Sequence, residues 1–165
     1  MAYDLDFVEM AEVKFHVRKF FLHPKSWEDP VNQISFSINW TSVKFEETNK
    51  DSIPRSKGVY AFSVKPEYLG LFETNYLFYI GKTNRTLRER FAEYVADAKG
   101  KGKPRAKVFH MMKMFSDYLH FNFAPLNTTL EVNLAEDQLI NTFVPNVNSV
   151  VAKAKIKPEY QNLYE

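Results

Sequence analysis

A well-marked helix signal is the feature of this sequence that most constrains its fold. Thr86 and Glu89 have the spacing of a capping box, in which each side chain accepts a hydrogen bond from the other residue's backbone N–H. Apolar residues then recur along one side of the following helix, at Leu87, Phe91, Val95 and Ala98. Because Gly100 and Gly102 come next, the sequence predicts a helix that begins after Thr86 and ends before Gly100.

Segments on both sides of this helix complete an alternating order of elements. Two strand-like segments precede it, Gly58–Val64 and Tyr76–Gly81. A second helix over 106–115, a strand over 118–123 and a third helix between 130 and 143 follow it. The order β-β-α-α-β-α predicts an α+β fold, with a small mixed or antiparallel central sheet flanked by about three helices.

The N-terminal third shows two further alternating patterns. Val13, Phe15 and Val17 form one, and the segment from Ile34 to Trp40 forms the other. We therefore expect a strand-rich N-terminal arm with its connector at 1–57, a core at 58–150 and a basic tail at 151–165 that carries Lys153, Lys155 and Lys157. Extra strands of this kind are consistent with a homodimer.

Composition excludes several classes of protein. The sequence has no cysteine, which rules out disulfides, thiolate nucleophiles and zinc–thiolate sites and fits a reducing compartment. Its first ten residues carry acidic and no basic side chains, unlike a secretory leader. No apolar run approaches the roughly 18 residues of a membrane span. We expect a cytoplasmic protein without a membrane partner.

Positive charge is concentrated in one segment. Between Lys82 and Lys107 there are nine basic and three acidic residues, so this segment carries +6 while the whole chain carries +2. A local positive field of this kind suits a phosphate backbone. The alternative is a solvated helix face followed by a Gly-Lys loop.

Several motifs in the core segment have both structural and chemical interpretations. Tyrosines in strands usually pack against neighbours, and glycines at strand ends usually form turns. Arg90 and Tyr94 share one helix face, where the arginine could simply stack on the ring. Glu136 lies in line with Leu139, Ile140 and Phe143 on an apolar stripe, so either a cation meets a buried carboxylate or Glu136 forms a capping box with Asn133.

Taken in order, these motifs resemble the GIY-YIG nuclease superfamily. The series consists of Gly-Val-Tyr at 58–60, Tyr-Ile-Gly-Lys at 79–82, Arg90 with Tyr94, and Glu136 followed nine and twelve residues later by Pro145 and Asn148. The resemblance covers Gly58 to about Asn148, more than half of the chain. Within the superfamily it is greatest to the N-terminal nuclease domain of the incision enzyme of bacterial excision repair. It implies a metal-dependent DNA endonuclease on a GIY-YIG-like fold.

Two departures from the family pattern bear on the alignment. The gap between Tyr60 and Tyr79 is longer than the family's usual short hairpin, with 65–75 as the insertion. The loop at 83–86 is one residue longer, which moves the arginine match from Arg88 to Arg90. Arg90 keeps Tyr94 at the expected offset and leaves Phe91 on the core side, while Arg88 remains a candidate phosphate contact.

The resemblance also implies a role for each site residue. Glu136 would be the single ligand of one Mg²⁺ or Mn²⁺, an arrangement that is common for Mg²⁺. Tyr79 would be the general base, and Tyr60 would position the water or phosphate. The remaining roles are a stabilising cation at Lys82, a phosphate clamp at Arg90, a further hydroxyl at Tyr94 and structural hydrogen bonds from Asn148. We expect these groups to gather around one ion at the surface of the sheet.

DNA would be held by the basic segment around this site. The candidate phosphate contacts are Arg85, Arg88, Lys101, Lys103, Arg105 and Lys107. Such contacts orient a duplex without reading its sequence. Two hypotheses compete with an active nuclease: a nucleic-acid-binding or regulatory module that keeps the fold without cleaving, and a plain α+β domain whose tyrosines match by chance.

Overall fold

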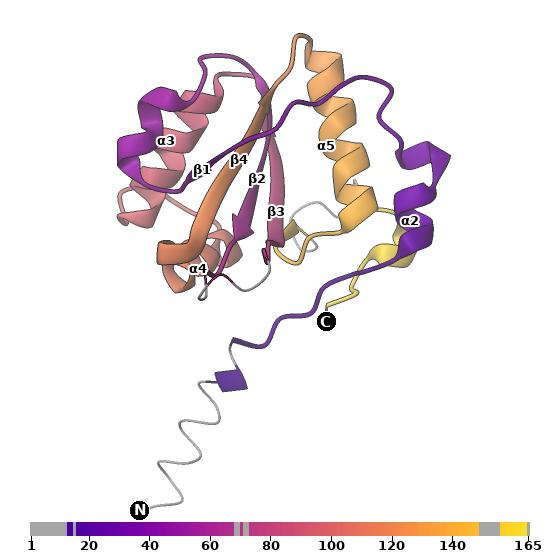
Figure 1. Ribbon diagram of the computed structural model, residues 1–165, viewed down its shortest axis with the longest axis horizontal. Coiled ribbons are helices and arrows are strands. Elements are labelled where there is room, and N and C mark those ends of the chain that lie inside the picture. Colours follow the sequence, from indigo (N-terminus) through magenta and orange to yellow (C-terminus); the bar gives the residue numbers. More distant parts are fainter. Residues whose placement is uncertain (1–12, 15, 68–69, 71–72, 149–155, 165) are drawn as a thin grey trace, which may run out of the picture.

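The computed structural model describes residues 13–14, 16–67, 70, 73–148 and 156–164. Its elements are α2 (Pro24–Glu28), η1 (Pro30–Asn32), β1 (Thr41–Lys44), η2 (Glu47–Ser52), β2 (Gly58–Val64), β3 (Tyr76–Thr83), α3 (Leu87–Ala98), α4 (Ala106–Met114), η3 (Ser116–Tyr118), β4 (Leu119–Pro125), α5 (Thr129–Phe143) and η5 (Pro158–Tyr160). The sheet lies between α3 and α4 on one side and α2 and α5 on the other (Figure 1). The predicted α+β class is confirmed.

The sheet has four strands in the order β1-β4-β2-β3, and every neighbouring pair is antiparallel. Strand β2 lies in the interior, where Gly58 pairs with Pro125 of β4 and with Thr83 of β3. A Cβ added at Gly58 would lie 2.2 Å from the Ala124 carbonyl oxygen, so only glycine fits this crossing point. Strand β3 is an edge strand, so the backbone N–H and C=O groups on its outer edge have no strand partner among the described residues and are available to loop residues.

The predicted capping box begins helix α3. The Thr86 side chain accepts a hydrogen bond from the Glu89 N–H, and the Glu89 carboxylate accepts one from the Thr86 N–H. Leu87 and Phe91 are fully buried against the sheet. The local signal and the apolar stripe therefore agree, and they set the direction in which α3 crosses the sheet.

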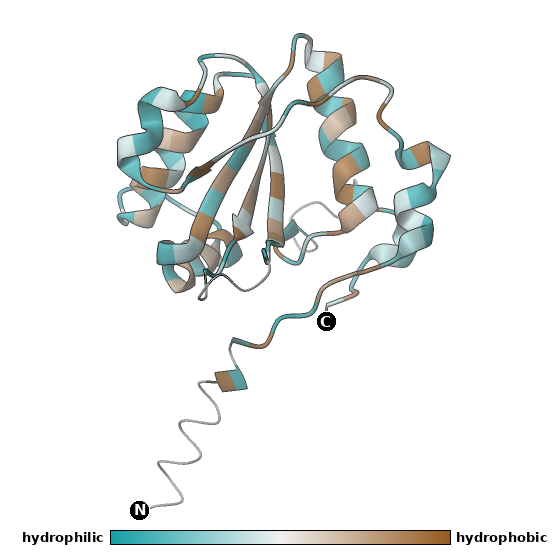
Figure 2. Ribbon diagram, in the orientation of Figure 1, coloured by the Kyte–Doolittle hydropathy of each residue, from teal (hydrophilic) through white to brown (hydrophobic). Residues whose placement is uncertain are grey.

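Aromatic rings fill the space between the sheet and helices α3 and α4. Tyr60 stacks on Phe121 with 5.3 Å between ring centroids, and Phe91 meets the edge of Phe121 at 5.1 Å. The opposite face is smaller and aliphatic, with Val59 and Ala135 among its buried residues. Figure 2 shows apolar residues concentrated on the strands and in bands along the helices.

The N-terminal segment differs from its prediction as a strand-rich arm. Val13, Lys14 and His16 are helical, and the segment from Ile34 to Trp40 contains no strand. Its apolar residues instead pack against the cluster between the sheet and α5, so the alternation reflects burial in that cluster and not strand pairing. The strand of this region is β1, which joins the core sheet by pairing with β4. This arrangement removes the observation on which a homodimer was expected.

The C-terminal segment is attached to the core where the structure describes it. Ile156 is 3% exposed, and the Lys157 ammonium lies 2.9 Å from the Asp29 carboxylate. Residues of the predicted basic tail within 156–164 therefore pack against the core. Lys153 and Lys155 lie outside the described residues, as do the first twelve positions and part of the 65–75 insertion.

No helix in the described ranges combines the length and apolar character needed to cross a membrane.

A matched pair of leucines tests this packing. Leu119 in the interior strand β4 is fully buried, whereas Leu130 on α5 is 68% exposed. We expect Leu119→Ala to lower the free energy of unfolding by about 2–5 kcal/mol, because it leaves a cavity beside the aromatic layer. Leu130→Ala should change it by less than about 0.5 kcal/mol. Urea denaturation measures both, and equal effects would contradict the assigned face of β4.

Candidate active site

Four consecutive residues of β3, from Tyr79 to Lys82, connect the predicted catalytic residues. Tyr79 and Gly81 face α3 and α4, whereas Ile80 and Lys82 face α5, because side chains alternate along a strand. The site is therefore described by the contacts that each of these four residues makes.

A cluster of two phenols and one guanidinium lies on the α3 side. The Arg90 Nε donates to the Tyr60 hydroxyl at 3.0 Å, and Arg90 Nη2 donates to the Tyr94 hydroxyl at 3.1 Å. The two hydroxyls are 3.0 Å apart, and the Arg90 guanidinium lies 4.5 Å from the Tyr94 ring centroid. Arg90 thus both stacks on Tyr94 and is fixed in orientation by two hydroxyls.

Gly81 makes this cluster possible. A Cβ at this position would lie 2.6 Å from two atoms of the Tyr60 side chain. Tyr60 is 1% exposed and packed among other rings, so it has little room to move away. The glycine of the Tyr-Ile-Gly-Lys motif is therefore required by the close approach of the Tyr60 ring to the β3 backbone.

On the α5 side, Lys82 forms an ion pair with Glu136. Its Nζ lies 2.9 Å from Glu136 Oε2, and the two side chains are 24% and 11% exposed. Helix α5 is capped by Thr128 with Glu131, so the alternative capping box of Asn133 with Glu136 is wrong. Glu136 lies within the helix, and its carboxylate is balanced by a cation, as burial requires.

Asn148 closes the free edge of β3. Its Oδ1 accepts from the Ile80 N–H, and its Nδ2 donates to the Ile80 carbonyl, both at 2.7 Å. These two bonds reproduce the pairing that a neighbouring strand would make. The side chain is 2% exposed, so Asn148 holds the residue that lies between Tyr79 and Gly81.

The Tyr79 hydroxyl accepts a hydrogen bond from Arg105 Nη2, and the Arg105 guanidinium lies 5.3 Å from the Tyr79 ring centroid. Arg105 was predicted as a DNA contact, and its interaction with Tyr79 was not foreseen. Glu93 was also missed: it binds Arg90 at 2.7 Å and Arg85 on its other oxygen. The i,i+3 spacing of Arg90 and Glu93 is a signal that identifies this pair from sequence.

The expected cluster is divided between two faces of the sheet. Tyr60, Tyr94 and Arg90 lie on the α3 side, and Lys82 with Glu136 lies on the α5 side. This differs from the expectation of one group around one ion on a single surface, because adjacent residues of a strand point in opposite directions. The two groups lie on either side of the β3 backbone at 81–82.

Much of the positive charge of the 82–107 segment is balanced locally. Five of its nine cations form ion pairs with carboxylates: Lys82, Arg85, Arg88, Arg90 and Lys99. Arg88 also donates to the carbonyls of Ile53 and Asp51, both at 2.7 Å, so it anchors η2, and the predicted phosphate contact is corrected. The exposed cations Lys101, Lys103 and Lys107 have no ion pair within the described part of the chain.

Burial keeps the inner phenols protonated at neutral pH. Desolvation raises the pKa of Tyr60 to about 12, with Tyr79 adding to the effect and Arg90 opposing it. Burial also raises the pKa of the Tyr94 hydroxyl well above its usual value. For Arg90, burial lowers the pKa, but the interactions with Tyr60 and Tyr94 outweigh it, so the pKa of the guanidinium is raised above its usual value. Arg90 therefore stays cationic beside two neutral hydroxyls.

The donor chemistry of Glu136 fits a hard divalent cation. A single carboxylate completed by water and phosphate oxygens is a common Mg²⁺ arrangement. Within the described residues no group of three or more His, Cys, Asp or Glu side chains is placed to hold a metal. Glu136 is thus the candidate ligand, and a bound cation would share its carboxylate with Lys82.

Comparisons with protein-family models, with curated proteins and with solved structures found no match to this chain.

The raised pKa of Tyr60 predicts how stability depends on pH. The unfolded chain loses this proton near pH 10 and the folded protein near pH 12, so the stabilisation is complete below pH 10 and is lost as pH rises to 12. We expect the loss to be about 2 kcal/mol and to be smaller in Tyr60→Phe. Urea unfolding at pH 8, 10 and 11.5 measures it. Tyr118→Phe, at a side chain that is 49% exposed, should keep the wild-type pH slope, and identical slopes in all three proteins would refute the assignment.

Proposed function

We propose that this protein is a metal-dependent endonuclease that hydrolyses DNA phosphodiester bonds at the carboxyl end of β3. The observation that carries the proposal is an unbroken series of contacts through 79–82. It runs from Tyr94 and Arg90 through Tyr60 to Gly81, and then from the adjacent Lys82 to Glu136. Residues separated by up to 76 positions, and expected from their order alone to share a site, approach two adjacent residues of one strand from its two faces.

Arg90 is the group best suited to hold the scissile phosphate. A planar guanidinium forms two parallel hydrogen bonds to phosphate oxygens, and its side chain is 28% exposed. Tyr60 and Tyr94 are almost fully buried, and both hydroxyls contact the guanidinium. They are therefore positioning residues that hold Arg90 in place, a change from the direct contact with water or phosphate that the sequence indicated for Tyr60.

Tyr79 is the proposed general base. Its hydroxyl already accepts a hydrogen bond from Arg105, so a guanidinium lies beside the oxygen that would take the proton. Arg105 therefore assists the base in this scheme, whereas Lys82, the cation expected there from the sequence, lies on the opposite face and pairs with Glu136. Asn148 keeps the β3 backbone in place between Tyr79 and Lys82 through its paired hydrogen bonds to Ile80.

Glu136 would hold one Mg²⁺ or Mn²⁺, which supplies positive charge for the negative charge that develops on the phosphate. The DNA backbone would cross the end of β3, with Arg90 approaching from one face and Glu136 from the other. Lys101, Lys103 and Lys107 are the proposed contacts to flanking phosphates, because they are exposed and lie in the segment that follows α3. A DNA substrate places the enzyme inside the cell, in the cytoplasm.

The Lys82–Glu136 ion pair favours one alternative function. With its carboxylate already balanced by an ammonium, the protein would bind nucleic acid through the same basic surface without cleaving it. The two functions differ in one measurement: the alternative predicts DNA binding that is insensitive to Mg²⁺ and no cleavage products.

Cleavage of plasmid, linear, nicked and branched DNA with Mg²⁺ or Mn²⁺ tests the proposed activity. We expect Glu136→Gln to lower the cleavage rate at least about a hundredfold, since it removes the charged ligand while keeping the shape of the side chain. Glu28→Gln, at an exposed position on α2, should leave the rate unchanged. Melting temperatures identify any loss of folding, and cleavage by a folded Glu136→Gln protein at the wild-type rate would refute the metal site.

Arg90→Lys tests the phosphate clamp separately. Lysine keeps the charge but cannot donate to both phenols and a phosphate in one plane, so we expect the cleavage rate to fall about 10²- to 10³-fold. Arg55→Lys, at an exposed position outside the site, serves as the matched control and should cleave at the wild-type rate. Equal rates for Arg90→Lys and Arg55→Lys would remove Arg90 from the mechanism.

A further inference from the structure

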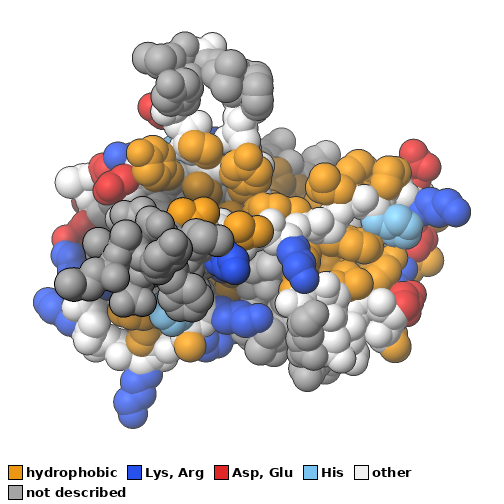
Figure 3. All heavy atoms as spheres, turned by 90° about the horizontal axis from the view of Figure 1, so that it is seen from below, with side chains coloured by type: hydrophobic (Ala, Val, Ile, Leu, Met, Phe, Trp, Pro, Cys, Tyr) orange, Lys and Arg blue, Asp and Glu red, His pale blue; other side chains and the backbone are white. Residues whose placement is uncertain are grey.

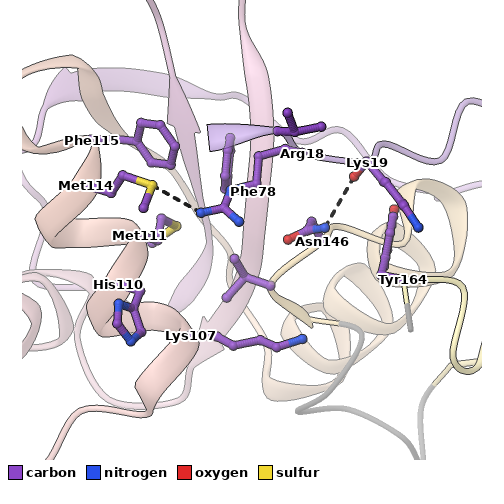
Figure 4. A pocket seen from close by; sticks show the side chains of 12 residues that line it. Arg18, Lys19, Phe78, Lys107, His110, Met111, Met114, Phe115, Asn146 and Tyr164 are labelled. Carbon is purple, nitrogen blue, oxygen red and sulfur yellow. Dashed lines mark hydrogen bonds between the residues drawn. The ribbon is translucent and has the colours of Figure 1, made fainter. Parts of the chain in front are cut away.

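A cavity of about 450 Å³ opens beside β3, where Phe78, the residue before Tyr79, forms part of its wall, outside the site described above. It lies between α4, the strand residue Phe78, the N-terminal residues 17–19 and the loop at 146–147. Its size is within the range of small-molecule pockets. The lining side chains come from five separate parts of the chain, and Figure 4 shows them directed around one opening.

The polar part of the lining is positively charged. Arg18, Lys19 and Lys107 line the cavity, and none of its described lining residues carries a carboxylate. The Lys19 and Lys107 ammonium groups form no ion pair with the described residues. In Figure 4 the Lys107 side chain extends from α4 across the opening toward Asn146, and Figure 3 shows Lys and Arg side chains beside apolar surface on this side of the molecule. Three cations without a balancing carboxylate favour an anionic ligand.

Arg18 provides a second observation that points to a ligand. One of its terminal nitrogens, Nη2, lies 3.1 Å from the Met114 sulfur, a weak acceptor. Its Nε is buried and has no hydrogen-bond partner among the described residues. A buried guanidinium donor without an acceptor is costly, so an anionic oxygen in the cavity would relieve this cost.

The floor of the cavity is apolar and aromatic. Phe78 and Phe115 meet with 5.0 Å between ring centroids, and Met111 and Met114 lie beside them. Flat rings stack on such a surface, and methionine sulfur adapts to their edges. The lining therefore suits a ligand that joins an aromatic ring to an anion.

We propose that this cavity binds a nucleoside phosphate unit, with the base on Phe78 and Phe115 and the phosphate on Arg18, Lys19 and Lys107. The choice of a nucleotide rests on the proposed function, because Phe78 precedes Tyr79 and Lys107 follows Arg105 by two residues. The unit is either an unpaired nucleotide of the DNA substrate or a free nucleotide. Base stacking next to cationic side chains is the usual means by which proteins hold single nucleotides of a strand.

Calorimetric titration of the full-length protein with thymidine 5′-monophosphate in EDTA tests the site without cleavage. We expect one-to-one binding that Lys107→Ala weakens at least tenfold, the effect of losing one charge-assisted hydrogen bond. Lys113→Ala is the matched control on the same helix, where the ammonium lies 5.7 Å from the Phe109 ring centroid and outside the cavity. It should bind within twofold of the wild type.

Two partial ligands test the two halves of the site. Thymidine lacks the anion and octyl phosphate lacks the ring, so both should bind at least tenfold more weakly than the nucleotide. Absence of nucleotide binding, equal effects of the two lysine variants, or tighter binding of octyl phosphate would overturn the proposal.

A competition arm identifies the source of the ligand. Displacement of the nucleotide by a short 5′-phosphorylated oligothymidylate assigns the cavity to a DNA strand, and nucleotide binding without displacement assigns it to a free nucleotide. Both results support the proposed chemistry. Nucleotide binding in EDTA does not need the metal ligand, so Glu136→Gln should retain it. Nucleotide binding by a wild-type protein that never cleaves DNA would therefore refute only the proposed function. DNA cleavage by a protein that does not bind the nucleotide would refute only this inference.

Discussion

The close packing of the Tyr60 ring on the α-carbon of Gly81 is the contact on which the candidate site depends. It leaves no room for a Cβ at position 81, and it brings the Tyr60 hydroxyl within hydrogen-bond distance of Arg90 and Tyr94. Both phenols are buried among aromatic rings, so their positions are set by the same packing that stabilises the fold. The orientation of one arginine is thereby built into the core.

Electrostatics on the two sides of β3 follow different rules. On the α3 side, Arg90 is charged and the two hydroxyls that contact it are neutral. Its carboxylate partner among the described residues is Glu93, and the rest of its hydrogen-bonding capacity is available to an external anion. On the α5 side, Lys82 and Glu136 balance each other. A phosphate is thus attracted to one face, whereas a divalent cation on the other face has to compete with an ammonium.

The positive charge of the 82–107 segment is less available than a count of residues indicates. Arg88 supports η2, and Lys99 pairs with Glu47 of the same element, so these cations stabilise the packing of a loop on α3. Charge toward solvent remains at Lys101, Lys103 and Lys107. Of these, Lys107 also lines the cavity beside β3, whose wall includes Phe78, the residue before the candidate base.

The sequence by itself determined the elements whose signals are local. The capping box at Thr86, the apolar stripe of α3 and the strand at Gly58–Val64 were predictable because capping and periodicity act within a few residues. Tertiary structure alone decided the rest. The alternating apolar residues between Ile34 and Trp40 pack against the cluster between the sheet and α5 and form no strand. The cation that pairs with Glu136 is Lys82, which lies 54 positions away in sequence. The division of the site between two faces likewise follows from strand geometry, since residues adjacent in sequence point to opposite sides of a sheet.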